Sequence, residues 1–207
     1  MPRTKPAEER RADLLASARR AFVAKSVTAT TLEDITSGAG VSKGLFWQYF
    51  RSKEEVVFVL QQQYAERFAD AVREAVAAAP DWRAKLDACV ETCLDRFEAE
   101  RDLHDVLFRH TDPARLGHGP HNHAAGADGA RPGPPAHEAL IAAIAELLAD
   151  GAAAGAYRVG DPTALATLLY AALHAFDPTF APGRRAADLL PAARQLFRRA
   201  AGLPAPE

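Results

Sequence analysis

Apolar residues recur at spacings of three and four along most of the chain, which is the pattern of amphipathic helices. The first stripe predicts a helix over residues 8–25. Thr31, with Asp34 three residues later, is typical of a second helix start. Ser42 is suited to cap a third helix over residues 43–50, and a Gly-Ala-Gly stretch separates the second helix from the third. The N-terminal region is therefore predicted to hold three helices.

The rest of the chain shows longer apolar stripes interrupted by prolines and glycines. These stripes predict a helix that Ser52 caps and Pro80 ends, a helix over 81–100, a continuation through 103–108, a helix over 137–154, one that starts at Asp161-Pro162, and one over 184–201. No stretch alternates as a strand would, so we expect an all-α protein of about nine helices.

One segment departs from this pattern. Residues 111–136 hold five prolines and five glycines, together with several histidines. A structureless loop of this length is uncommon inside a compact domain and is usually functional or disordered. We expect this segment to be disordered.

Composition narrows the class of protein. A chain of 207 residues can bury a core without metals or disulfides. It has no run of eighteen apolar residues and no apolar N-terminal signal, so a cytoplasmic location is expected. Cys89 and Cys93 lie four apart, and their side chains on one helix would be too distant for a disulfide, so both are expected to be reduced and buried.

Charge is unevenly distributed along the chain. Residues 1–53 carry ten Lys and Arg against five Asp and Glu, although the whole chain has a net charge of −2. The remainder is therefore acidic. A basic module joined to an acidic body suits a protein that touches a polyanion through one part only.

The most informative stretch, residues 31–53, reads TLEDITSGAGVSKGLFWQYFRSK. Two short helices joined by a glycine-containing turn form a helix-turn-helix, whose second helix enters the DNA major groove. The apolar set that would lock the two helices together is Leu32, Ile35, Ala39, Val41 and Phe46. Trp47 falls outside this set, and a large exposed aromatic usually marks an interface.

This stretch resembles the N-terminal motif of the tetracycline-repressor (TetR/AcrR) family of regulators. The resemblance is carried by Ala39-Gly40-Val41-Ser42-Lys43-Gly44, Leu45-Phe46-Trp47-Gln48-Tyr49-Phe50 and Ser52-Lys53-Glu54. Leu45 stands where the family usually has threonine, and Trp47 where it usually has tyrosine. The resemblance implies a DNA-binding domain over 1–53 and a helical regulatory and dimerisation domain over 54–207.

The resemblance also implies which residues contact DNA. Gln48 is suited to pair with adenine, and Leu45 to contact a thymine methyl group. Lys53 would neutralise a phosphate. The full set of expected DNA contacts is Thr30, Thr31, Ser42, Lys43, Gly44, Leu45, Trp47, Gln48, Tyr49 and Lys53.

The family resemblance further implies that the last two helices pair with a second copy as a four-helix bundle, and that a ligand cavity lies among helices four to eight. The candidate wall residues are Tyr64, Phe68, Trp82, Cys89, Cys93, Phe97, His104, Phe108, Tyr170 and His174. Each is also a plausible plain core residue. The expected function is a homodimeric, sequence-specific transcriptional repressor that a small, largely apolar effector releases from operator DNA.

Other readings remain open. His118, His121 and His123, with His104 and His110 shortly before them, would suit a metal-responsive regulator. The sequence also does not exclude a ligand-independent DNA-binding dimer. The chain has no Glu-x-x-His pair, no Gly-x-Ser-x-Gly and no phosphate loop, so we expect neither an enzyme nor a cofactor.

Overall fold

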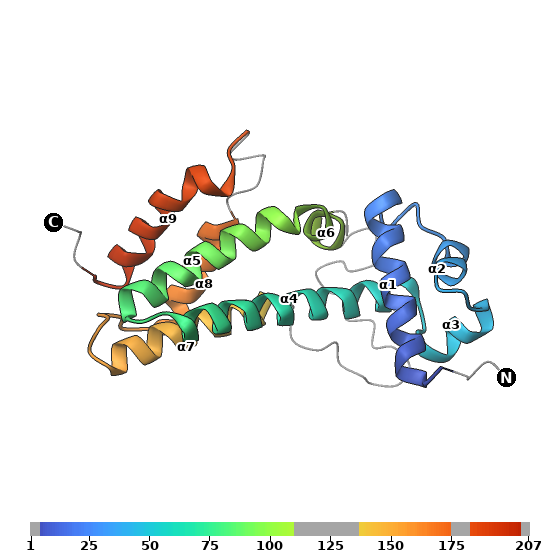
Figure 1. The fold of residues 1–207 in the computed structure, drawn as a ribbon, viewed down its shortest axis with the longest axis horizontal. Coiled ribbons are helices and arrows are strands. Elements are labelled where there is room, and N and C mark those ends of the chain that lie inside the picture. Colours follow the sequence, from blue (N-terminus) through green and yellow to red (C-terminus); the bar gives the residue numbers. More distant parts are fainter. Residues whose placement is uncertain (1–4, 110–136, 175–182, 204–207) are drawn as a thin grey trace, which may run out of the picture. The chain divides into compact units, whose positions relative to one another are not determined.

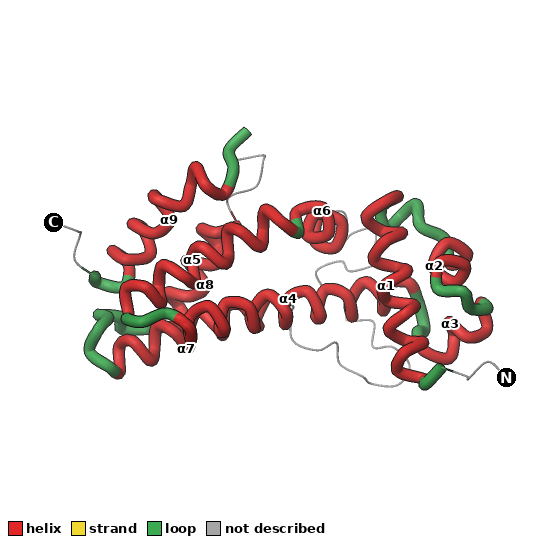
Figure 2. Tube along the Cα trace, viewed as in Figure 1, coloured by secondary structure: helices red, strands yellow, loops and turns green. Residues whose placement is uncertain are grey.

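The computed structural model describes residues 5–109, 137–174 and 183–203, and this part of the chain is built of helices and turns with no strand (Figures 1 and 2). The all-α expectation is confirmed. The helices are α1 (Ala7–Lys25), α2 (Leu32–Gly38), α3 (Lys43–Tyr49), α4 (Lys53–Ala78), α5 (Trp82–Ala99), α6 (Arg101–His104), the π-helical turn η1 (Asp105–Arg109), α7 (His137–Ala153), α8 (Pro162–His174) and α9 (Ala186–Ala200).

The N-terminal caps form as the sequence predicts. The Asp34 amide donates to Thr31 Oγ1 at 3.2 Å, and the Thr31 amide donates to Asp34 Oδ2 at 2.9 Å, which completes a capping box. Ser42 Oγ accepts from the Leu45 amide at 3.3 Å and begins α3. Between the two helices Gly40 has a φ of 66°, a conformation that other residues rarely adopt.

Side-chain caps also begin two of the later helices, α5 and α8. Asp81 begins α5 by accepting from the Ala84 amide at 2.8 Å, and Asp161 accepts from the Ala164 amide at 2.9 Å at the start of α8. Two expectations need correction. The α-helical geometry expected through 103–108 ends at His104 and gives way to the π-helical turn, and α9 begins at Ala186, not at 184.

The described residues form two compact units. The first takes in the described part of Met1–Gln63 and of Arg101–Gly133, and the second that of Tyr64–Glu100 and Pro134–Glu207, so that α4 contributes to both. The functional division at residue 53 expected from the sequence stays a prediction.

Each unit has its own buried core. The first is built on Leu14, Ala18, Phe22, Ile35, Phe46, Phe50 and Leu107, and the second on Leu86, Val90, Ile144, Leu148, Leu173 and Phe197. In the first unit α1 packs on α2, and α2 on α3. In the second unit α5 packs on α9 and α7 on α8.

Ion pairs reinforce the contact between α5 and α9. The Arg198 guanidinium forms two hydrogen bonds with the Asp87 carboxylate, one of them at 2.8 Å, and Arg194 pairs with Glu91 at 2.8 Å. Because Arg198 and Asp87 are both partly shielded from water, this bidentate pair also fixes the rotation of α9 on α5.

Tyr157 holds the end of α7 against the start of α5. Its side chain is buried, and its hydroxyl donates to the Trp82 carbonyl oxygen at 2.5 Å. Gly151 packs directly against the Tyr157 ring, where an added Cβ would overlap ring carbons. Neither Tyr157 nor Gly151 stands out in the sequence pattern.

Two of the expectations concern residues outside the described ranges. The first is the disorder expected over 111–136, and the second is the histidine cluster at His118, His121 and His123. Both stay predictions. Within the described ranges, no helix is long and apolar enough to cross a membrane.

Candidate nucleic-acid interface

The helix α3 has one buried side and one exposed side. Phe46 is fully buried, and its ring lies 5.2 Å from the Trp47 ring in an edge-to-face arrangement. Trp47 itself is 55% exposed, and Lys43, Gly44 and Gln48 are exposed as well. The residues expected to read DNA therefore share an accessible face, whereas the expected locking residue Phe46 belongs to the core.

The cation of Lys43 already has a partner. Its ammonium forms an ion pair with the Glu33 carboxylate of α2, and both side chains are exposed. The sequence alone does not indicate this partner, although Glu33 lies in the first turn of α2. A phosphate group that approached Lys43 would have to compete with Glu33.

Two other expected DNA contacts are occupied inside the first unit. Lys53 Nζ donates to the Val27 carbonyl at 2.8 Å and to the Thr30 carbonyl at 3.0 Å. Thr30 is 2% exposed, and its hydroxyl lies 2.7 Å from the Ser26 carbonyl oxygen. Both residues thus tie the turn before α2 to its surroundings. Thr31 and Ser42 are exposed and serve as helix caps.

The remaining two expected contacts, Leu45 and Tyr49, are half-buried. Arginines extend the basic character of this unit. Arg20 Nη2 donates to the Gly38 carbonyl at 3.2 Å, and the Arg11 guanidinium lies 5.2 Å from the centre of the Phe50 ring. Both arginines therefore support α2 and the end of α3 from α1.

The carboxylate of Asp34 is strongly stabilised. Lys25 Nζ donates to it at 2.6 Å, and the backbone and hydroxyl of Thr31 donate as well, so that its pKa falls to about 2. A folded-state pKa below the unfolded value stabilises the fold at higher pH. This stabilisation is complete above the unfolded value of about 4 and is lost as the pH falls towards 2.

We therefore expect Asp34→Asn to unfold at lower urea concentration than the parent at neutral pH, with the difference shrinking below about pH 4. Urea titrations of both proteins between neutral pH and pH 2 measure this difference. As a control, Thr31→Val should raise the Asp34 titration midpoint seen by NMR. A difference in unfolding that is the same at every pH would contradict the assignment.

Six of the ten candidate effector residues lie in the second unit around a common core. Tyr64, Phe68, Cys89 and Cys93 are buried, and Phe97 and Tyr170 are half-buried. The Phe68 ring lies 5.9 Å from Tyr64 and 5.1 Å from Phe97. Burial raises the pKa of Tyr170 to about 12 and raises that of Tyr64 further.

The two cysteines of this core are free thiols, as expected from the sequence. A hydrogen bond with Cys89, together with burial, raises the pKa of the Cys93 thiol well above its ordinary value. The Cys93 thiol is therefore kept in the protonated form, and both cysteines are small, buried core side chains.

The other candidates for the effector site are dispersed. Trp82 packs edge-on against Tyr157, with ring centres 5.7 Å apart. His104 and Phe108 belong to the first unit, where their rings stack 5.1 Å apart. The helix α8 ends at His174, but the side chain of this residue lies outside the description. Among the described residues, no three His, Cys, Asp or Glu side chains gather as metal ligands.

The geometry defines a class of protein. It is a helical protein whose first unit carries a capped helix-turn-helix, and the second helix of this motif, α3, has an exposed face. Residues 14–60 match the family model described as "Bacterial regulatory proteins, tetR family". This part of the chain is therefore similar to the N-terminal domain of TetR-family regulators.

Two relatives of this chain are named as HTH-type transcriptional regulators. The chain is 33% identical over 103 residues to the HTH-type transcriptional activator FasR of Mycolicibacterium smegmatis, covering 50% of this chain and 47% of FasR. It is 34% identical over 90 residues to the HTH-type transcriptional repressor KstR2 of Rhodococcus jostii, covering 44% of each. The aligned part is about half the length of these relatives.

The fold is shared over more of the chain. The crystal structure of the transcriptional regulator FadR from Bacillus subtilis in complex with stearoyl-CoA superposes with a TM-score of 0.68. It covers 91% of this chain and 98% of FadR at 13% identity. The similarity at this identity is one of fold.

Proposed function

We propose that this protein is a sequence-specific DNA-binding transcriptional regulator that reads the major groove with α3. The observation that carries this proposal is the exposed face of α3, where Lys43, Gly44, Trp47 and Gln48 lie together on a capped helix-turn-helix. A helix anchored on one side by the buried Phe46 suits insertion into the groove, since its exposed side chains can then face base edges.

Each exposed residue has a role that its chemistry supports. Gln48 carries an amide that is able to pair with adenine through two hydrogen bonds. Gly44 has no side chain and allows the backbone to approach DNA closely. Trp47 is suited to pack on the sugar-phosphate backbone, with its indole N–H donating to a phosphate oxygen. Lys43 binds phosphate after leaving Glu33, so Glu33 opposes DNA binding.

We propose that a homodimer binds DNA through two such helices. Leu168 on α8 is 68% exposed and Leu196 on α9 is 49% exposed, and large apolar side chains exposed on a body of this fold suit pairing with a second copy. Two half-sites about 34–36 Å apart, one turn of DNA, would then be read together.

The proposed effector is a small, largely apolar molecule that releases the dimer from its operator, which makes the protein a repressor. The aromatic core around Phe68 and the thiols of the second unit support an apolar ligand. FadR of Bacillus subtilis, which shares the fold, was crystallised with stearoyl-CoA. An effector acts only as far as it binds one state of the dimer more tightly than the other.

A mobility-shift titration with the intergenic DNA that flanks the gene tests the DNA-binding function. Lys43→Met is expected to bind about tenfold more weakly and to lower the salt dependence of binding by about one charge. Glu33→Gln should bind more tightly, because Lys43 is then free. Arg158→Met, which removes an exposed cation from the second unit, is the matched control. A dimer that binds no DNA at all would overturn the proposal.

A further inference from the structure

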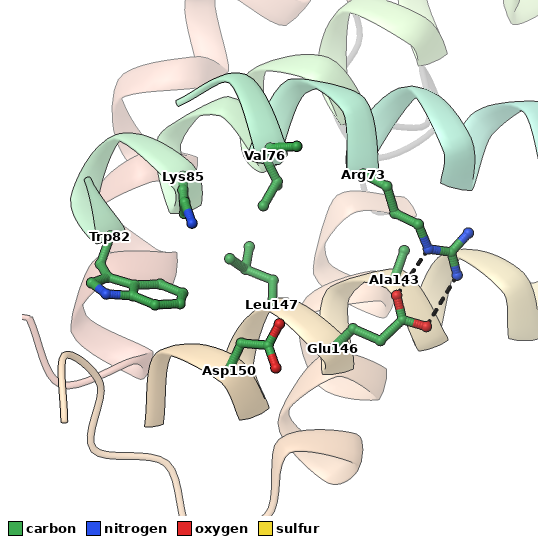
Figure 3. Close-up of a pocket in the computed structure, with 9 residues that line it drawn as sticks. Arg73, Val76, Trp82, Lys85, Ala143, Glu146, Leu147 and Asp150 are labelled. Carbon is green, nitrogen blue, oxygen red and sulfur yellow. Dashed lines mark hydrogen bonds and ion pairs between the residues drawn. The ribbon is translucent and has the colours of Figure 1, made fainter. Parts of the chain in front are cut away.

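The second unit contains a cleft that the DNA-binding function does not use. It lies between α4, α5 and α7 and has a volume of about 270 Å³ (Figure 3). Val76, Leu147 and the Trp82 ring provide its apolar surface. Charged side chains from all three helices surround this apolar surface, so the cleft differs in chemistry from the aromatic core around Phe68.

Two of the charges in the cleft neutralise each other. The Arg73 guanidinium donates to the Glu146 carboxylate at 2.8 Å and 3.2 Å, as Figure 3 shows. This pairing lowers the pKa of Glu146 and raises that of Arg73. The two charges therefore compensate each other within the lining of the cleft.

The other two charges have no ionic partner among the described residues. Lys85 on α5 places its ammonium 4.4 Å from the centre of the Trp82 ring, and Asp150 comes from α7. One cation and one carboxylate, on different helices, thus line the same small apolar cleft. A complementary ligand would carry both an anionic and a cationic group.

Both sides of the cleft are held in place by Tyr157. Its hydroxyl donates to the carbonyl of Trp82, and its ring edge meets the indole. The same ring packs on Gly151, the residue after Asp150. The backbone beside Lys85 and Asp150 is therefore already ordered before a ligand arrives. Binding would then lose little conformational entropy there.

We propose that this cleft binds a free amino acid with an apolar or aromatic side chain. The ligand carboxylate pairs with Lys85, the ligand ammonium pairs with Asp150, and the side chain lies on Val76, Leu147 and Trp82. The cleft volume is just below the usual range of small-molecule sites, which suits a compact ligand and excludes a long acyl chain.

Calorimetric titration of the full-length protein with L-phenylalanine tests this proposal. We expect a dissociation constant of about 1 mM or below. N-acetyl-L-phenylalanine lacks the cation and L-phenylalaninamide lacks the anion, so each is expected to bind about tenfold more weakly. No heat of binding with L-phenylalanine at about 10 mM would overturn the proposal.

Variants assign each ligand group to its partner. Asp150→Asn should weaken L-phenylalanine about tenfold but leave N-acetyl-L-phenylalanine unchanged, and Lys85→Met should weaken L-phenylalanine while leaving L-phenylalaninamide unchanged. Glu74→Gln, an exposed change on α4 outside the cleft, is the control and should bind like the parent. Equal binding by all variants would overturn the assignment. The titrations contain no DNA, so their outcome is independent of operator binding.

Discussion

In the Phe46→Ala variant, the first unit is expected to unfold at a far lower denaturant concentration than in the parent protein. The Phe46 ring is fully buried in α3 and lies 5.5 Å from the Phe50 ring. Truncation of a buried phenylalanine to alanine removes its apolar contacts and leaves a cavity, which costs about 3–5 kcal/mol. The α2–α3 pair should lose its fixed geometry, and DNA binding with it.

The two tryptophans of the chain allow this effect to be located. Trp47 lies in the first unit and Trp82 in the second. With Trp82→Phe as background, the fluorescence of Trp47 during urea unfolding reports on the first unit. Gln48→Ala, an exposed change on the same helix, should shift the free energy of unfolding by less than about 0.5 kcal/mol. A Phe46→Ala transition that coincides with that of Gln48→Ala would show that α3 is not packed as described.

Gly151→Ala is expected to destabilise the second unit by about 2–3 kcal/mol, near the upper end of overpacking effects. The new methyl group would overlap the Tyr157 ring. The ring is buried and its hydroxyl is bonded to the Trp82 carbonyl, so it has little freedom to move aside. The Gly151 carbonyl also accepts the amides of Ala156 and Tyr157, which fixes the backbone there.

Urea unfolding followed by Trp82 fluorescence, with Trp47→Phe as background, measures this loss. Gly160→Ala is the matched control, because an added Cβ at Gly160 meets open space and its φ needs no glycine. That variant should be close to neutral or slightly stabilised. If both variants unfold alike, the contact between Gly151 and Tyr157 is not a tight one.

The helix-turn-helix could be predicted because its determinants are local in sequence. Thr31 and Asp34 are three residues apart, Ser42 directly precedes its helix, and Gly40 marks a turn that needs a positive φ. Caps and turn residues act through the backbone a few positions away, so their spacing alone indicates the structure. The same holds for Asp161 and Pro162 at the start of α8.

The missed features depend on residues distant in sequence. Lys85 and Asp150 come together only after α5 packs near α7, and Tyr157 reaches Trp82 across 75 positions. The engagement of Lys53 by the Val27 and Thr30 carbonyls is of the same kind. The family resemblance places Trp82 with Phe68 among the candidate effector residues, whereas the structure places Trp82 in the cleft. The π-helical turn after His104 has no sequence signal that we identify.

The bonds from Lys53 to the turn before α2 bear on the engineering of hybrid regulators. Lys53 is the first residue of α4, yet its ammonium holds Val27 and Thr30, more than twenty positions earlier. A crossover placed just before α4 would separate this lysine from the loop that it anchors. Grafting the helix-turn-helix of this chain onto another helical body should therefore retain Lys53, with the junction placed further along α4.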